Sequence, residues 1–163
     1  MKLPNILIRD RGIILSEANG FTLIEILVAF GIFVLILSLG LLLAMDFYKT
    51  YAFNYETSLL AASLQSARSR ALSNMNQSPH GLHFENGVYV IFEGGSYDSS
   101  DPKNKTIPMS YLVEVKDEAT GLPAGDIIFE QLSGSVSGDF ALLVQSGAKS
   151  SQISVNREGG INW

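Results

Sequence analysis

A single carboxylate, Glu25, lies near the start of the most apolar stretch of the chain, and residues 21–45 contain no other charged residue. An ionised carboxylate in hydrocarbon costs about 2.5–3.5 kcal/mol at the bilayer centre and less near the surface. Glu25 lies only about 6 Å of helix rise beyond Phe21, so its side chain could reach back to the interface. The other explanation is that it pairs with a cation inside the membrane. The chemistry indicated here is ion pairing.

The remaining polar residues do not form a catalytic or metal-binding set. His80 and His83 are three residues apart in an extended segment, which places them on opposite faces, so we expect two surface histidines. Asp98, Asp101 and Asp117 could ligate calcium, but their spacing matches no EF-hand, and we expect solvated acidic loops. The chain has no Cys, no Gly-x-Ser-x-Gly motif and no phosphate-binding glycine motif. We predict a non-enzymatic protein with no metal and no cofactor.

Composition indicates one small, unusually apolar domain. The chain has 163 residues, of which 47% are hydrophobic and 17% charged. These values exclude a disordered chain, and the length leaves no room for a multi-domain enzyme. The formal net charge of −5 argues against a protein whose main work is phosphate neutralisation. Nucleic acid is therefore an unlikely partner.

Most of the excess of apolar residues lies in a segment long enough to cross a membrane. Ile26–Met45 contains 20 residues, which as a helix rise about 30 Å, the thickness of the hydrocarbon core. Three basic residues occur in the first eleven positions, whereas residues 46–65 contain Lys49 alone, so we expect a cytoplasmic N-terminus. An ordinary secretory signal fits poorly, because its apolar run is shorter and ends in a small-x-small motif. A plain signal anchor remains the alternative.

The residues at the start of this segment resemble a known processing site. Gly20-Phe21-Thr22-Leu23-Ile24-Glu25, followed by an uninterrupted apolar helix, resembles the class III leader junction of type IV pilins and type II secretion pseudopilins. The resemblance implies that a membrane-embedded prepilin peptidase cuts after Gly20 and N-methylates the new terminus at Phe21. Cutting creates an α-amine that is cationic near neutral pH. Glu25 would pair with this amine, in its own chain or in a neighbouring subunit.

The chain beyond the span continues as a helix in this interpretation. No proline occurs between Pro4 and Pro79, so we predict one helix from Phe21 to about Asn76. Apolar residues recur at steps of three or four beyond Met45, which predicts a stripe covered by a sheet. The predicted stripe contains Tyr48, Tyr51, Tyr55, Leu59, Leu60, Leu64, Ala67, Ala71 and Met75.

After Pro79 the apolar pattern becomes strand-like. Asn86-Gly87 predicts a two-residue hairpin turn, and Gly94–Pro108 is polar and predicts a long exposed loop. The fold class predicted is α+β, with a long N-terminal spine helix, transmembrane in its first half, packed at its outer half against a small antiparallel β-domain. The predicted strands are Leu82–Glu85, Val88–Phe92, Tyr111–Val115, Ile127–Gln131, Phe140–Gln145 and Ile153–Asn156.

These predictions divide the chain into four parts. They are a removed leader peptide (1–20), a transmembrane and assembly half of the helix (21–45), its amphipathic outer half (46–78) and a β-rich head (79–163). Leu64–Leu72 and Ile153–Ile161 resemble the minor branch of the family, of GspH/FimT type.

The resemblance implies a structural subunit of a type IV filament machine, either a type II secretion pseudopilus or a type IV pilus. Its implied partners are prepilin peptidase, other pilins or pseudopilins, the bacterial inner membrane and, in secretion, exported proteins. A DNA-uptake minor pilin is one alternative, although loss of residues 1–20 changes the formal net charge from −5 to −6. A sensor or enzyme tethered by a plain signal anchor is the other.

Overall fold

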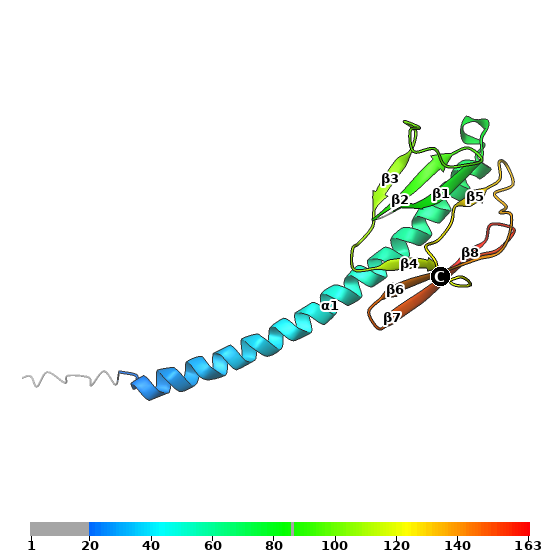
Figure 1. The fold of residues 1–163 in the computed structure, drawn as a ribbon. Helices are drawn as coiled ribbons and strands as arrows, with labels where there is room; N and C mark the ends of the chain where they lie inside the picture. Colours follow the sequence, from blue (N-terminus) through cyan, green and yellow to red (C-terminus); the bar gives the residue numbers. More distant parts are fainter. Residues whose placement is uncertain (1–19, 86) are drawn as a thin grey trace, which may run out of the picture. The chain divides into compact units, whose positions relative to one another are not determined.

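The computed structural model describes residues 20–85 and 87–163, so the predicted leader lies outside the described residues except for Gly20 (Figure 1). The chain forms two compact units that divide between Leu41 and Leu42. The architecture is α+β, as predicted: one long helix and two small antiparallel sheets.

Helix α1 runs from Leu23 to Leu72. It ends four residues before the predicted end because Asn74 takes a left-handed conformation (φ +54°), which breaks the helical hydrogen-bonding pattern. A short 3₁₀ helix, η1 (Met75–Gln77), follows, and Pro79 precedes the first strand. Asparagine is one of the few residues that adopt this conformation readily, which explains the early stop.

The first unit consists of residues up to Leu41, and all of its described side chains are exposed. Helix α1 includes a stretch that is long and apolar enough to cross a membrane, with none of that stretch buried inside the protein. A helix that is apolar on every side needs an apolar surrounding. This finding agrees with the predicted span.

Two four-stranded sheets form the head in the second unit. The first sheet has the order β3-β2-β1-β5, with β1 (His80–Glu85), β2 (Val88–Glu93), β3 (Lys105–Pro108) and β5 (Ile127–Phe129). The second has the order β4-β6-β7-β8, with β4 (Glu114–Asp117), β6 (Phe140–Ser146), β7 (Lys149–Val155) and β8 (Ile161–Asn162). Every strand pair is antiparallel, and the pairing of Glu85 with Val88 confirms the predicted hairpin.

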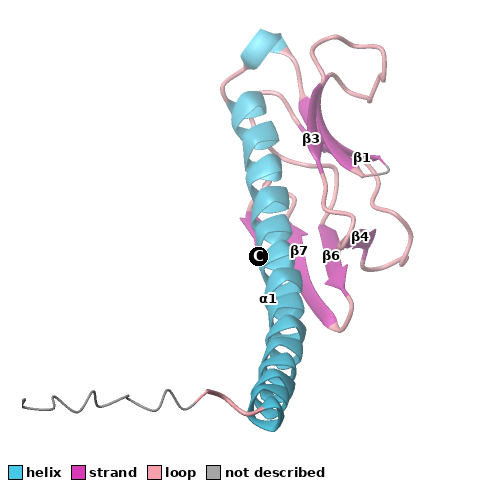
Figure 2. Cartoon of the chain, turned by 90° about the vertical axis from the view of Figure 1, so that its left-hand side faces the viewer, coloured by secondary structure: helices cyan, strands magenta, loops and turns pink. Residues whose placement is uncertain are grey.

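The core of the head forms where both sheets pack against the second half of α1 (Figure 2). Leu60, Leu64, Ala67 and Ala71 are fully buried, as the stripe predicted. Their steps of three and four residues keep them on one face of the helix. The strands contribute the largest remaining buried side chains: Tyr89, Phe92, Phe129, Leu82, Ile91, Ile127, Leu142 and Ile153.

The predicted stripe was wrong at its two ends. Tyr48, Tyr51 and Tyr55 are 58%, 70% and 54% exposed, and Met75 is also exposed. Ala52, Phe53, Glu56 and Thr57 are buried instead. Positions 48, 51 and 55 lie about half a helical turn away from Phe53 and Leu60, so the predicted stripe joined two opposite faces.

Several strand predictions also need correction. Strand β7 begins at Lys149, four residues before the predicted start at Ile153. Strand β3 lies inside the predicted loop Gly94–Pro108, and β8 was not predicted at all. Strand β4 begins at Glu114, three residues after the predicted start at Tyr111. Strands β3, β4 and β8 are short, and all three lie at sheet edges, where one partner strand supplies the pairing.

Gly159 is a point of close packing between the C-terminal segment and α1. It has φ +77°, and an added Cβ would clash with the Gly134 carbonyl oxygen and approach Arg68 Nε to 2.9 Å. We expect Gly159→Ala to lower the free energy of unfolding by about 2–4 kcal/mol. Thermal unfolding of the full chain in detergent, followed by near-ultraviolet circular dichroism, measures this.

Gly147→Ala is the matched control for this substitution. Gly147 also has a positive φ (+59°), but no atom lies within 4 Å of its added Cβ. Gly147→Ala should lower the free energy of unfolding by only about 1 kcal/mol, which is the cost of the left-handed backbone conformation without a steric clash. Equal losses in the two variants would show that the contact between Gly159 and Gly134 contributes nothing.

Candidate functional site

The predicted processing junction is described from Gly20 onward, and its residues cap the start of α1. The Glu25 N–H donates to Thr22 Oγ1 (3.3 Å), and the Ile26 N–H donates to the Thr22 carbonyl (3.2 Å). Thr22 is therefore the N-cap residue and Glu25 the third residue of the helix. This Thr-x-x-Glu spacing is that of a capping box. The sequence contained that signal, but it did not enter our interpretation of Glu25.

The helix start also explains why a carboxylate is tolerated there. The first turn of a helix carries a partial positive charge, which stabilises a nearby anion by about 0.3–1 kcal/mol at an exposed site. Glu25 is exposed, and Phe21 is 77% exposed. The carboxylate therefore lies close to the position where cutting would create an α-amine, and it is free to meet a second chain.

Among the residues that the structure describes, none requires glycine at position 20. None of their atoms lies within 4 Å of a Cβ added to Gly20, and the Gly20 backbone does not adopt a positive φ. Gly81, by contrast, has the Phe92 ring against its added Cβ, so packing alone explains that glycine. Gly20 therefore fits a requirement from outside the folded chain, such as the active site of a protease.

Glu56 is a buried carboxylate that the sequence interpretation missed. It is fully buried on α1, and its Oε2 accepts a hydrogen bond from the Ser110 N–H (3.0 Å). Burial raises the pKa of the neighbouring Tyr89 phenol, and the Glu56 carboxylate raises it further. Glu56 thus ties the helix to the segment that leads from the first sheet into the second, which is a structural role. Glu56 is three residues after Phe53 and four residues before Leu60, and this helical spacing was the sequence signal that it lies on the buried face.

The two histidines have separate surroundings, and the prediction that both lie at the surface was wrong. His80 is 2% exposed, and its Nδ1 lies 3.1 Å from the Ser78 carbonyl. Burial lowers the pKa of His80, which favours the neutral ring. His83 is half-buried, and its Nδ1 lies 2.6 Å from Asp126 Oδ1 while its ring stacks on Tyr97. These are different neighbours, so the two rings do not share a ligand position.

The acidic loop residues stabilise turns. Asp98 Oδ1 accepts hydrogen bonds from the hydroxyl and the N–H of Ser100, which lower the pKa of Asp98. Asp117 Oδ1 accepts the equivalent pair from Thr120, and the pKa of Asp117 is lowered in the same way. Within the described part of the chain, no three His, Cys, Asp or Glu side chains are placed to hold a metal ion.

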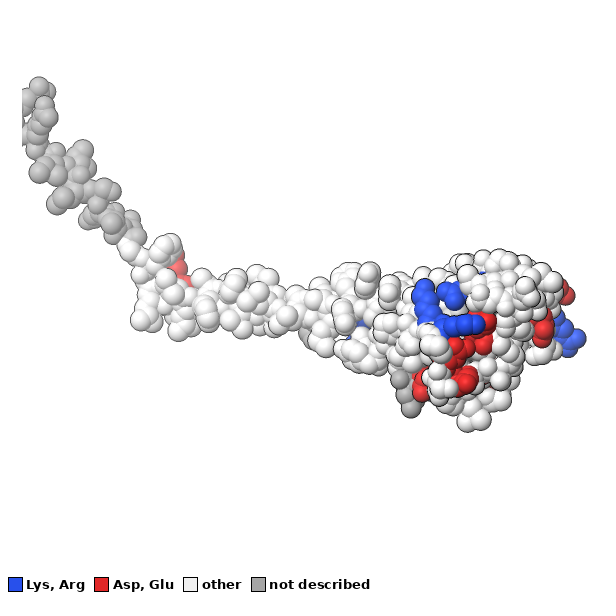
Figure 3. Space-filling model, turned by 90° about the horizontal axis from the view of Figure 1, so that it is seen from above, with Lys and Arg blue, Asp and Glu red and all other residues white. Residues whose placement is uncertain are grey.

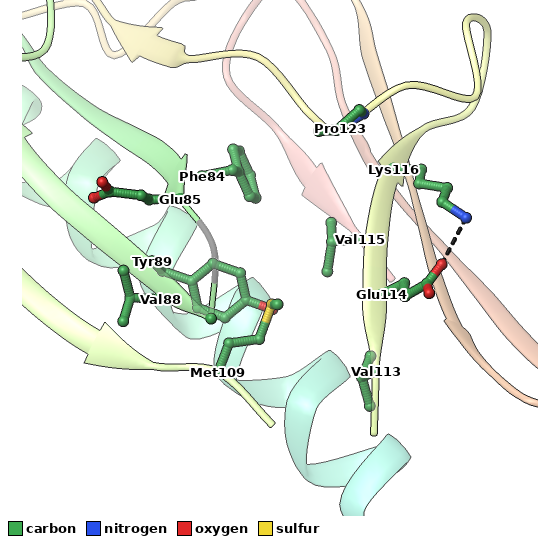
Figure 4. Close-up of a pocket in the computed structure, with 11 residues that line it drawn as sticks. Phe84, Glu85, Val88, Tyr89, Met109, Val113, Glu114, Val115, Lys116 and Pro123 are labelled. Carbon is green, nitrogen blue, oxygen red and sulfur yellow. Dashed lines mark ion pairs between the residues drawn. The ribbon is translucent and has the colours of Figure 1, made fainter. Parts of the chain in front are cut away.

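A cavity of about 460 Å³ opens between the β1–β2 hairpin and β4 (Figure 4). Its lining is mainly apolar, and it also includes Lys116 and Glu114 of β4, which form an ion pair between Nζ and Oε2 (2.6 Å). The phenol of Tyr89 and the side chain of Met109 lie close together on the hairpin side in this view. The apolar lining residues are Phe84, Val88, Tyr89, Met109, Val113, Val115 and Pro123.

Charged side chains gather on the head, and one face carries basic and acidic groups side by side (Figure 3). Arg68 is half-buried, and its guanidinium donates to the Glu158 carbonyl (3.0 Å), so it holds the C-terminal segment on α1. Lys103 is paired with Glu93 (2.9 Å). Such mixed, paired charges do not form the uniform basic surface that phosphate binding needs.

Comparisons with family models, with curated proteins and with solved structures found no match to this chain. The chain's own residues are therefore the basis for its function. Two features stand out: a junction of Gly20, Phe21 and Glu25 that the described fold alone does not explain, and one helix that continues from that junction into the core of the head.

Proposed function

We propose that this chain is a minor pilin or pseudopilin, a non-enzymatic structural subunit of a type IV filament machine. The observation that carries the proposal is the Gly20-Phe21 junction with Glu25 four residues beyond it, placed at the N-terminus of α1. Prepilin peptidase cuts after Gly20 and methylates Phe21 in this proposal. The subunit then waits in the inner membrane, with its head outside the cytoplasm, until it enters a pilus or pseudopilus.

The continuity of α1 supports an assembly role. The same helix carries the apolar segment and supplies Leu60, Leu64, Ala67 and Ala71 to the core of the head. A membrane tether for an enzyme has no need to form part of its enzyme's core. The cavity beside β4 lacks a set of converging titratable groups, so it also gives no support for catalysis.

Deletion of the gene tests the proposed function. We expect loss of at least one of three activities that depend on type IV filaments: exoprotein export, surface motility and transformation. Which of them is lost identifies the machine, and restoration by the wild-type gene is the control. The processed chain should also be recovered with other pilin-like subunits after mild cross-linking. If all three activities are normal and no such subunit is captured, the proposal is wrong.

A further inference from the structure

A band of exposed aromatic residues lies on α1 directly after the apolar run, within the second unit. Phe47 is 75% exposed, and Tyr48 and Tyr51 are also well exposed. They lie on the side of the helix opposite Phe53, which packs into the head. Tyr51 stacks on Tyr55 one turn further on, with ring centroids 6.4 Å apart. The β-domain therefore does not explain these rings.

Two lysines lie at the same height along the helix. Lys149, at the start of β7, donates a hydrogen bond from Nζ to Thr50 Oγ1, so the β6–β7 turn lies beside this part of α1. Lys49 precedes Thr50 and is exposed. Neither lysine has an ion-pair partner among the residues that the structure describes. Asp46 is one turn away, so the band has a net charge of +1.

The height of this band matches the headgroup layer of a bilayer. Phe47 and Tyr48 lie two and three residues beyond Met45, which is about 3 and 4.5 Å of helix rise, within a polar layer that is about 5–8 Å thick on each side of the hydrocarbon core. Tyr51, at about 9 Å, lies at the outer edge of this layer. Tyrosine is enriched at this depth because its ring is apolar and its hydroxyl is polar. Lysine is attracted by anionic headgroups.

We propose that Phe47, Tyr48, Tyr51, Lys49 and Lys149 form an interfacial collar that binds the phospholipid headgroup layer. The collar fixes the depth of the helix and seats the β6–β7 turn on the bilayer surface. Continuity with the apolar run and the net positive charge favour an anionic phospholipid surface over a second copy of the helix. The inference rests on the membrane anchoring in the proposed function, but it adds the lipid contact and the position of the head.

The full chain in vesicles provides the test. The chain has no cysteine, so a single Ala148→Cys in the β6–β7 turn can carry a spin label. Vesicles of phosphatidylcholine and phosphatidylglycerol would include a lipid with a Ni²⁺ chelate on its headgroup. We expect strong relaxation of this label by the Ni²⁺. A label at Gly95→Cys should show little relaxation by Ni²⁺, because the loop between β2 and β3 lies at the opposite end of the head (Figure 1).

Substitutions separate the two parts of the collar. Combined Tyr48→Ser and Tyr51→Ser should remove most of the Ni²⁺ effect at Ala148→Cys. Tyr111→Ser, at an even more exposed tyrosine on the head, should leave this effect unchanged. Lys149→Gln should weaken the Ni²⁺ relaxation at Ala148→Cys only when phosphatidylglycerol is present. Lys105→Gln on β3 is the control and should leave this relaxation unchanged.

Two results would overturn the inference. The first is equal relaxation at Ala148→Cys and Gly95→Cys. The second is spin–spin broadening at a Tyr51→Cys label without Ni²⁺ relaxation, which would show that a second helix covers this face. Intact mass of the same samples reports cutting after Gly20 independently, so failure of the collar is distinguishable from failure of the proposed function.

Discussion

A Gly20→Trp chain is expected to accumulate as uncut precursor in the membrane of cells that contain prepilin peptidase. The wild-type chain should instead begin at an N-methylated Phe21. Because no atom of residues 21–85 or 87–163 lies within 4 Å of a Cβ added at Gly20, we expect the substitution to leave the head and α1 folded. The effect therefore reports the protease, whose active site has to accept the residue before the cut bond. Intact-mass measurement of membrane-purified protein distinguishes precursor from product.

Gly31→Trp provides the matched control. Gly31 lies on the same apolar helix, and its added Cβ also has open space around it. This variant should be cut and methylated as efficiently as the wild type. Normal processing of Gly20→Trp, or a wild-type chain that retains residues 1–20 in the presence of active peptidase, would contradict the family assignment.

Removing the carboxylate at position 25 is expected to block recruitment into filaments while leaving insertion and cutting intact. Glu25→Ala removes a charge from the apolar segment, so insertion becomes more favourable. The cationic amine at Phe21 then lacks its partner, and in low dielectric an unpaired charge is strongly unfavourable. The measurement is the fraction of processed chain that cross-links to other pilin-like subunits, compared with the fraction left alone in the membrane.

The capping box requires a second variant, because Glu25 has a structural role as well. Glu25→Gln keeps a residue that suits the third position of a capping box but removes the charge. We expect it to fail in recruitment as Glu25→Ala does. Thr22→Ala, which removes the N-cap oxygen and keeps the carboxylate, should cost about 1 kcal/mol of helix stability and still assemble. If Glu25→Gln assembles normally, capping is the role of Glu25 and ion pairing is not.

The parts of the fold that were predictable have strong local patterns. The apolar run, the long segment without proline and the buried stripe from Leu60 to Ala71 each depend on residues close together in the chain. The hairpin at Gly87 has a similar local signal. Helical periodicity and turn chemistry act over a few residues, so one sequence suffices to detect them.

The elements that were missed depend on distant neighbours. Lys105–Pro108 becomes β3 because it pairs with β2, and its own side chains are mostly exposed, so it carries no alternation of apolar and polar residues. The tyrosines at 48, 51 and 55 have helical spacing too, and only the position of the sheets shows that they lie on the other face. Periodicity identifies a face without saying what covers it.

The candidate site was predictable in its residues but only partly in its physics. Gly20 and Glu25 were found from the order of residue types, and the structure adds that Gly20 has no packing role and that Glu25 helps to cap α1. His80 and Glu56 could not be assigned to the interior, because polar residues are mostly exposed unless a specific partner is available. Those partners, Ser78 and Ser110, are apparent only in the folded chain.

The contact of Arg68 with Glu158 has a consequence for the timing of folding. Arg68 is on the helix, whereas Glu158 and the adjacent β8 follow it by about 90 residues in the chain. Synthesis runs from the N-terminus, so the apolar face of α1 is made well before the strands that cover it. The core of the head therefore cannot close until β8 has been made, and until then this apolar face is exposed to misfolding and aggregation.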